Sequence, residues 1–219
     1  MSNTLGALLA RFPSAPTDIP PELILGQRNG KLSLTLGGRA VHSLFNPTKE
    51  AKQVIEQVFA VPPSAFVAFG TGLGYILEEA CAYSPELPIV VFEPCPPWIP
   101  KAKELNPHFT CWTAPNVQWF GPGEEDQLAR ALQEAHPASL AVHHVNAWSQ
   151  FWPEQSAAIQ ELADACRFRR QVNVNTLHKF GKLWVRNLLR NRQRGVDGGL
   201  NHPHAARRNE RGDRASIQN

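Results

Sequence analysis

The sequence has few cysteines, and they lack the spacing that would give them a metal-binding or redox role. Cys81, Cys95, Cys111 and Cys166 are far apart, and no pair has the C-x-x-C pattern. Zinc sites and disulfide-rich secreted domains need clustered or regularly spaced cysteines. We therefore expect free thiols, a cytoplasmic location and no metal site.

Long apolar runs are also missing from the sequence. A helix that spans a bilayer needs roughly 20 apolar residues. Leu5, Leu8, Leu9 and Phe12 have helical spacing near the N-terminus, but Arg11 interrupts them. This pattern indicates a short amphipathic helix rather than a signal peptide, and we expect no membrane association.

The sequence contains no P-loop and no Cys/His pair with the spacing of a catalytic nucleophile and its base. His143 and His144 are adjacent in an expected strand, so their side chains point to opposite faces and cannot bind one ion. The tryptophans, among them Trp148, Trp152 and Trp184, indicate core positions rather than sugar-stacking platforms. We therefore assign no catalytic residue and no metal ligand.

Negative charge is absent from residues 167–194, which carry nine Lys/Arg and no Asp/Glu. Residues 1–166 carry nine Lys/Arg and 16 Asp/Glu. A basic segment of this kind suits nucleic acid, an acidic lipid surface or an acidic partner, or forms the solvated face of a helix. We favour the solvated face, because no nucleic-acid readout motif accompanies the charge.

Residues 66–93 are the most informative stretch, and they predict a strand, a glycine turn, a helix and a second strand. Phe66–Phe69 and Ile89–Phe92 are short apolar runs typical of buried parallel strands. Residues 70–74 have a G-x-G-x-G spacing that allows a sharp turn from a strand into a helix. This pattern predicts the first βαβ unit of a Rossmann-like sheet.

The glycine turn defines a candidate binding site. Gly70, Gly72 and Gly74 would line it, and Glu93 follows the second strand, where an acid can accept hydrogen bonds from ribose hydroxyls. The site would suit a nucleotide or an S-adenosylmethionine-like ligand. The alternative is that the glycines only permit close packing of the strand against the helix. We expect the chain to bind no cofactor.

The remaining segments complete an α/β fold, a Rossmann-like mostly parallel sheet with a small antiparallel hairpin region before it and helices after it. Asn29-Gly30 predicts a hairpin turn, and Asn46 and Pro47 predict a helix start. A later helix is expected from about Pro100, a third strand in HFTCW or VQWF, and a fourth in LAVHHVN. The expected divisions are an N-terminal helix and proline-rich linker (1–22), an antiparallel hairpin cap (23–45), the Rossmann-like domain (46–150), a helical segment (151–194) and a disordered tail (195–219).

Three blocks of sequence occur in an order that resembles a known family. They are His42-Ser43 with Pro47 and Glu50-Ala51, then Gly70–Tyr75 with Phe92-Glu93-Pro94, then Asn175-Thr176, Phe180-Gly181, Trp184-Val185, Asn187 and Asn191. In this order they resemble the N-terminal region of the motility-associated factor (Maf) flagellin glycosyltransferases, over roughly residues 23–194.

The resemblance implies a scaffold or partner-binding module. In that family, transfer of a nonulosonic acid from a CMP-sugar to flagellin is attributed to a following domain, which opens with a strand and a Gly-Pro-Ser-Leu turn. This sequence contains no such turn. The resemblance therefore implies a truncated module without catalytic activity of its own, with flagellin or another flagellar glycosylation protein as its partner.

Two other functions stay open on the sequence. One is a small nucleotide- or S-adenosylmethionine-binding enzyme that uses the Gly70–Gly74 turn. The other is nonspecific binding of nucleic acid or an acidic partner through residues 167–194. Residues 175–193 also combine an apolar stripe of Phe180, Trp184 and Leu188 with basic side chains, which predicts self-association through this helix.

Overall fold

The computed structural model describes residues 18–28, 30–135 and 139–168, together with Asn175 and Arg186. By its internal contacts the chain divides into two units, residues 1–172 and 173–219, and every element below belongs to the first. The predictions for the N-terminal helix, the basic segment after residue 168 and the C-terminal tail lie outside the described residues, apart from those two single positions.

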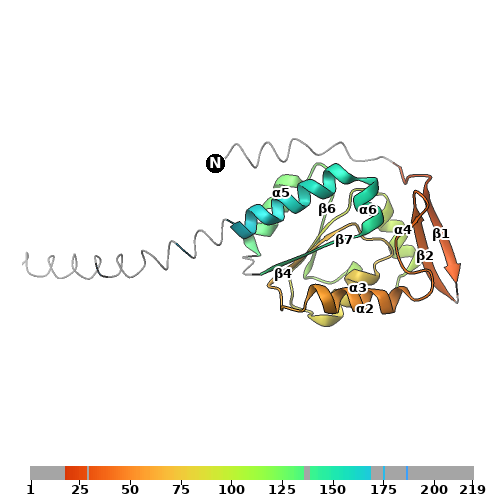
Figure 1. Ribbon diagram of the computed structural model, residues 1–219, viewed down its shortest axis with the longest axis horizontal. Coiled ribbons are helices and arrows are strands. Elements are labelled where there is room, and N and C mark those ends of the chain that lie inside the picture. The colour runs from red at the N-terminus through yellow and green to blue at the C-terminus, as the bar shows by residue number, and fades with distance from the viewer. Residues whose placement is uncertain (1–17, 29, 136–138, 169–174, 176–185, 187–219) are drawn as a thin grey trace, which may run out of the picture. The chain divides into compact units, whose positions relative to one another are not determined.

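A small antiparallel sheet comes first in the chain (Figure 1). It consists of β1 (Leu23–Arg28), β2 (Lys31–Leu36) and β3 (Arg39–Ala40), in the order β1-β2-β3. The predicted hairpin is confirmed, because Arg28 pairs with Lys31 across a two-residue turn. The third strand, β3, has two residues and pairs with the end of β2, Thr35 with Ala40 and Leu36 with Arg39.

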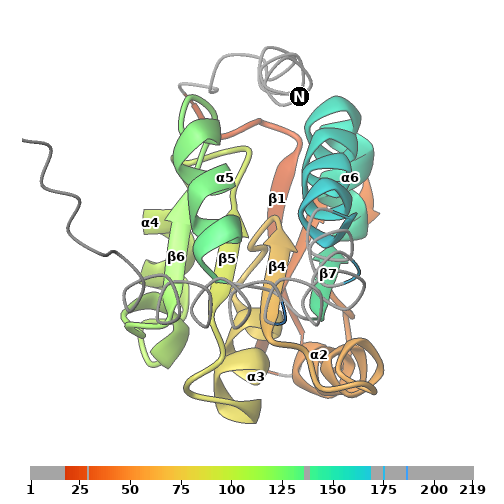
Figure 2. The same cartoon turned by 90° about the vertical axis from the view of Figure 1, so that its left-hand side faces the viewer.

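The main sheet has four strands, all parallel: β4 (Ala65–Phe69), β5 (Ile89–Phe92), β6 (Val117–Phe120) and β7 (Leu140–His144). Their order is β6-β5-β4-β7, as Figure 2 shows. The third strand is therefore VQWF, whereas Thr110–Trp112 of HFTCW forms a 3-10 turn. The order reverses between β4 and β7, which makes their carboxyl ends the switch point of the sheet.

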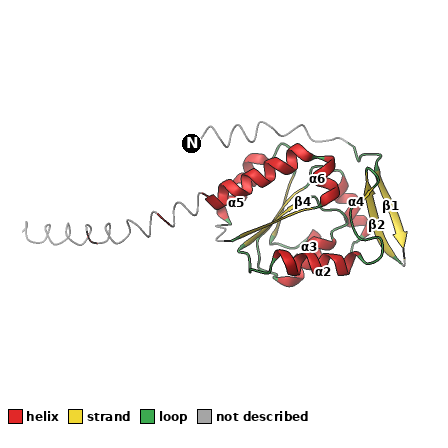
Figure 3. Ribbon diagram, in the orientation of Figure 1, coloured by secondary structure: helices red, strands yellow, loops and turns green. Residues whose placement is uncertain are grey.

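Helices pack around this sheet (Figure 3). They are α2 (Pro47–Val58), α3 (Tyr75–Tyr83), α4 (Trp98–Leu105), α5 (Glu125–Glu134), α6 (Asn146–Phe151) and residues 153–168, here helix 153–168. In Figure 1, α2 and α3 lie on one side of the sheet, while α5 and α6 lie on the other. This arrangement confirms the α/β class.

Local signals set where two of these helices begin. The Asn46 side chain accepts a hydrogen bond from Lys49 N, and Pro47 occupies the first turn of α2, as predicted. The start predicted for α4 was too late: the helix begins at Trp98 and contains Pro100. A proline is tolerated in a first turn because the N–H that it lacks would have no intrahelical partner there.

The core lies between the parallel sheet and its helices. All five residues of β4 are buried, because β5 and β7 flank the strand and helices cover its faces. Phe66, Phe69 and Phe92 have no exposed surface, and the rings of Phe69 and Phe92 stack with centroids 6.0 Å apart. Among the described residues, no helix is both long enough and apolar enough to cross a membrane.

Candidate functional site

The structure brings the four predicted site residues together at the carboxyl ends of β4 and β5. Gly70, Gly72 and Gly74 all have positive φ, with values of 82°, 53° and 87°. Gly70 N donates to Phe92 O over 2.8 Å, which ties the turn to the end of β5, directly before Glu93. The sequence therefore predicted the position of the turn correctly. Whether it binds a ligand depends on what lies around it.

Side chains of the chain itself fill the space beside each glycine. A Cβ atom added at Gly70 would lie within 3 Å of Trp148, and one added at Gly72 would lie equally close to His42. A Cβ at Gly74 would overlap Trp112. Because the three glycines have no side chain, the rings of Trp148, His42 and Trp112 can pack directly against the turn.

Hydrogen bonds from distant side chains also engage the main chain of the turn. Trp98 Nε1 donates to Gly72 O over 2.6 Å, and Asn106 Nδ2 donates to Leu73 O over 3.0 Å. Leu73 N donates to His42 Nε2 over 2.8 Å. A phosphate-binding turn offers its N–H groups to the ligand. Here partners within the chain accept from the N–H groups of Gly70, Thr71, Leu73 and Gly74.

Glu93 is the polar centre of the site, and it has no exposed surface. Its Oε2 accepts from both Thr71 N and Thr71 Oγ1, each over 2.8 Å. Its Oε1 accepts from Trp148 Nε1 over 2.8 Å and from Cys95 N over 2.9 Å. Burial raises the pKa of Glu93, and these hydrogen bonds lower it in part. Four donors match the four lone-pair positions of a carboxylate, so the arrangement suits the ionised form.

This geometry differs from the role predicted for Glu93. An acid that binds ribose needs free acceptor positions facing a cavity. Glu93 instead joins three segments of the chain: the glycine turn through Thr71, its own strand end through Cys95, and α6 through Trp148. As placed here, the carboxylate stabilises the packing of these segments.

His42 is a buried histidine that sequence reasoning did not connect to the turn. Its Nε2 accepts the Leu73 hydrogen bond, so Nδ1 carries the proton, and its ring meets Tyr75 edge-on with centroids 5.2 Å apart. Burial, with a smaller contribution from His143, lowers the pKa of His42 to about 3. The imidazole is therefore neutral at pH 7 and acts as a hydrogen-bond acceptor.

The switch point between β4 and β7 is where open α/β sheets bind ligands. In this chain Trp148, from α6, occupies the place beside Gly70, and its side chain is fully buried. The prediction that Trp148 is a core residue is confirmed. The indole fills the crevice and binds Glu93, so no open cavity lies between Gly70 and Trp148.

The structure also shows where the two adjacent histidines of β7 lie. His143 and His144 lie opposite Ala68 and Phe69 in consecutive register positions, so they face opposite sides of the sheet as predicted. His144 Nδ1 lies 2.8 Å from Ser156 Oγ, and its Nε2 lies 3.1 Å from Gln160 Oε1. Within the described ranges, no group of three or more His, Cys, Asp or Glu side chains could hold a metal ion.

Cys81, Cys95, Cys111 and Cys166 are all buried, and none of the four is part of a disulfide bond. Burial raises the pKa of the Cys95 thiol to about 11, with nearby Glu93 as the second cause, so the thiol is protonated at neutral pH. Glu78, in α3, accepts hydrogen bonds from Thr110 Oγ1 and from Cys111 N. It thereby ties the 3-10 turn to α3.

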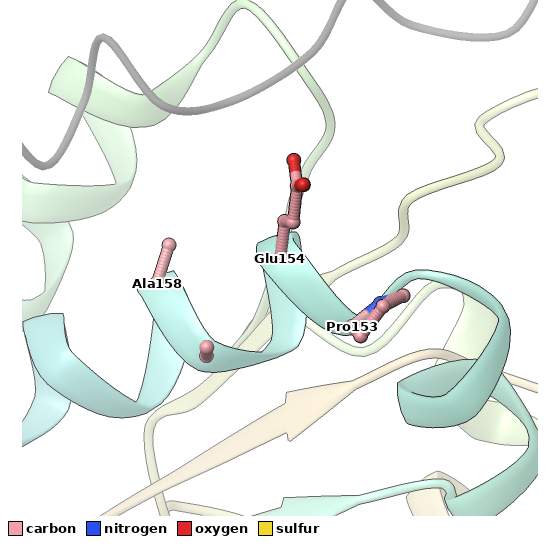
Figure 4. A pocket seen from close by; sticks show the side chains of 4 residues that line it. Pro153, Glu154 and Ala158 are labelled. Carbon is pink, nitrogen blue, oxygen red and sulfur yellow. The ribbon is translucent and has the colours of Figure 1, made fainter.

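Two hollows lie along the start of helix 153–168, and no glycine-turn residue lines either of them. One, of about 510 Å³, is lined by Pro153, Glu154, Ala157 and Ala158, which belong to the first two turns of the helix (Figure 4). The other, of about 240 Å³, is lined by residues 151–155. Gln155 is 1% exposed, and its Oε1 has no hydrogen-bond partner among the described residues.

Comparison with known proteins adds one distant relative. An uncharacterized protein of Treponema pallidum (strain Nichols) is 28% identical over 209 residues, an alignment that includes 84% of this chain and 66% of the relative. The chain thus spans just under two thirds of that protein's length. No family model matches the chain, and no solved structure does.

Proposed function

We propose that this chain is a non-catalytic scaffold or partner-binding domain. The observation that carries the proposal is the filled glycine turn. Trp148 and His42 occupy the space beside Gly70 and Gly72, and Glu93 has four donors from within the chain. A turn packed in this way holds three segments together, and the N–H groups of Gly70, Thr71, Leu73 and Gly74 already have acceptors within the chain.

The sequence resemblance suggests the setting in which such a scaffold would act. In this proposal the chain is the N-terminal module of a Maf-type flagellin glycosylation protein in the cytoplasm. A further domain of a longer protein would transfer the nonulosonic acid from its CMP donor. The chain itself would bind flagellin or a glycosylation partner. The greater length of the Treponema pallidum relative is compatible with an additional domain.

The first test is calorimetric titration of the chain with CMP and with S-adenosylmethionine, paired with biolayer interferometry against purified flagellin. We expect no heat of binding from either small molecule and a measurable association with flagellin. Micromolar binding of either small molecule would contradict the scaffold. No binding in either assay would reject flagellin as the direct partner of the chain.

A second candidate is an enzyme that binds a nucleotide or S-adenosylmethionine at Gly70, Gly72, Gly74 and Glu93. It is favoured by the three positive-φ glycines at the end of the first parallel strand. Ligand entry would require Trp148 to leave its place beside Gly70. This candidate predicts micromolar binding that Gly72→Val abolishes and that Trp148→Ala strengthens. A titration unaffected by both substitutions would reject it.

Nucleic-acid or acidic-partner binding through residues 167–194 remains a third proposal, and most of that segment lies outside the described residues. Arg167, the first residue of the segment, forms an ion pair with Asp164 over 2.8 Å and donates a hydrogen bond to Leu140 O. Charge-driven binding would weaken steeply with salt. Affinity for a DNA duplex that does not change between low and physiological salt would reject this proposal.

A further inference from the structure

The outer edge of β1 offers main-chain groups that β2 does not use. The sheet ends at β1. In an antiparallel ladder, alternate residues bond across to the neighbouring strand. Val41 N donates to Leu34 O over 2.8 Å, so the carbonyl of Leu34 points toward β3 rather than toward Leu25, its register partner in β1. The main-chain N–H and C=O of Leu25, and those of Gln27 two residues later, therefore point away from the sheet.

A second hydrogen bond gives the same alternation. Gly37 N donates to Glu22 O over 3.2 Å, which makes that pair a bonded one. The bonded pairs of the hairpin then follow at every second residue, and the odd-numbered residues of β1 are left out. Within the part of the chain that the structure describes, the outward main-chain groups of Leu25 and Gln27 have no hydrogen-bond partner.

The edge is also apolar and uncharged over residues 23–27, which are followed by Arg28 at the end of β1. Ile24 is 60% exposed and Leu25 is 42% exposed. Residues 23–27, LILGQ, contain no charged side chain and no proline. Monomeric proteins protect exposed edge strands with lysine, proline, a bulge or a covering segment. None of these devices lies within residues 23–27, so β1 is a template for another strand.

We propose that a second copy of this chain pairs with β1, antiparallel, about a two-fold axis at Gly26. In this register Leu25 lies opposite the partner's Gln27, and Gln27 lies opposite the partner's Leu25. Their outward groups form four main-chain hydrogen bonds, and the two three-stranded sheets become one sheet of six strands.

Gly26 is suited to the axis of this pairing. It faces its own symmetry mate in a non-hydrogen-bonded pair, where Cα atoms approach to about 4.5 Å. A glycine places no side chains at this close crossing. The pairing brings no like charges together along residues 23–27, because that stretch is uncharged. Because residues 23–27 of two copies can pair without charge repulsion, we favour a second copy of this chain as the partner of β1.

The contact is short, which sets the strength to expect. Leu23 N already donates to Pro20 O over 3.0 Å, and Pro20 and Pro21 precede the strand, so the new ladder cannot extend beyond Leu23. Two short strands bury less surface than a stable dimer needs. The dimer is therefore a weak one, with a dissociation constant of about 10–500 µM.

The test uses the full chain in sedimentation-velocity runs up to about 1 mM, with dissociation constants read from the concentration dependence. Gln27→Pro removes an outward N–H without removing a β1–β2 hydrogen bond, and Leu25→Lys adds a charge beside the axis. Val61→Lys is the matched control, because Val61 is 72% exposed in the loop between α2 and β4. Thermal melting checks that each variant is folded.

We expect the parent chain and Val61→Lys to dimerise equally and both edge variants to bind at least about tenfold more weakly. A parent chain that is monomeric throughout the range would overturn the proposal. So would a dimer of unchanged strength in both edge variants, which would place the contact elsewhere, for example in residues 175–193.

Amide hydrogen exchange of the parent chain gives an answer even where a variant fails to fold. Dimerisation through β1 slows exchange at Leu25 and Gln27 as concentration rises. The amide of Ile24, which is bonded to Thr35 in both states, serves as the internal reference. Equal exchange of Leu25 and Gln27 at low and high concentration would count against the edge pairing.

Discussion

The indole N–H of Trp148 donates a hydrogen bond of 2.8 Å to Glu93 Oε1, across 55 positions of sequence. This bond joins α6 to the end of β5, while the other oxygen of Glu93 holds Thr71 in the glycine turn. In a Rossmann-like fold these parts of the chain usually face a ligand. Here the glycine turn, the end of β5 and α6 are hydrogen-bonded to one another instead.

Glu93→Gln tests whether the buried acid is a carboxylate. The substitution keeps the size of the side chain but turns an N–H₂ group toward donors that need an acceptor. We expect the free energy of unfolding to fall by about 2–3 kcal/mol in urea titrations at pH 7. The exposed Glu86→Gln is the control, with a change below about 0.5 kcal/mol. A Glu93→Gln protein as stable as its parent would mean that Glu93 is protonated in the native state.

Two substitutions separate the contribution of Trp148 packing to stability from the contribution of its hydrogen bond to Glu93. Trp148→Ala leaves a cavity beside Gly70 and is expected to cost about 3–5 kcal/mol of stability. Trp148→Phe keeps most of the ring volume but loses the donor to Glu93, with an expected cost of about 1–3 kcal/mol. Added indole should raise the melting temperature of Trp148→Ala and leave that of the parent unchanged. A Trp148→Ala protein that indole does not stabilise would show that the site collapses.

Gly72 and Gly38 form a matched pair for the glycine turn. Both have positive φ, 53° and 75°, but a Cβ at Gly72 would meet His42, whereas one at Gly38 would meet nothing within 4 Å. Gly38→Ala should cost about 1–2 kcal/mol from the backbone conformation alone. Gly72→Ala should cost at least about 2 kcal/mol more, because the added methyl group displaces a buried imidazole. Equal losses in thermal unfolding would show that His42 moves aside freely.

His42, which is buried, and His143, which is partly buried, predict a loss of stability in mild acid. Burial lowers the pKa of His143 to about 4, and that of His42 to about 3. An unfolded histidine binds a proton below about pH 6.5, while these two stay neutral in the folded state, so protonation favours unfolding. Stability should therefore fall as the pH drops from about 6.5 to 4, by up to about 1.4 kcal/mol per pH unit for each histidine.

Substitution of His143 tests whether the histidines cause this pH dependence of stability. His143→Gln should reduce the pH dependence of urea unfolding between pH 4 and about 6.5, because one group that charges on unfolding has been removed. His108→Gln is the control, since His108 is exposed. The explanation fails if both variants keep the parent slope.

Gln155→Met should stabilise the chain. Gln155 is buried, and its Oε1 has no partner among the described residues. An apolar side chain of similar shape removes the cost of that unpaired acceptor, about 1 kcal/mol. The control is Gln127→Met on the exposed side of α5, where we expect a change within about 0.5 kcal/mol. A destabilised Gln155→Met protein would indicate that a water or ligand pairs with the amide.

Local signals accounted for most of the fold. The strands at Phe66–Phe69 and Ile89–Phe92, the hairpin before them and the start of α2 at Asn46 all follow from patterns within a few residues. One helix start was placed too late, also for a local reason. The helix expected from about Pro100 begins at Trp98, because a first turn accepts proline.

The contents of the candidate site could not be predicted in the same way. The contact of His42 with Leu73 joins residues 31 positions apart, and that of Trp148 with Glu93 joins residues 55 apart. Neither pair shares a helix face or a strand register. Six tryptophans in the sequence gave a general signal for the core, but not which of them would lie against a glycine.

The sequence by itself determined that this chain forms an α/β fold with a glycine turn after its first parallel strand, because strand runs, turn glycines and helix caps act through the backbone over short distances. Tertiary structure alone decided that the turn is filled. The placement of β7 beside β4 carries α6, and with it Trp148, over Gly70. That outcome depends on which elements become neighbours, and close packing then leaves room for one occupant.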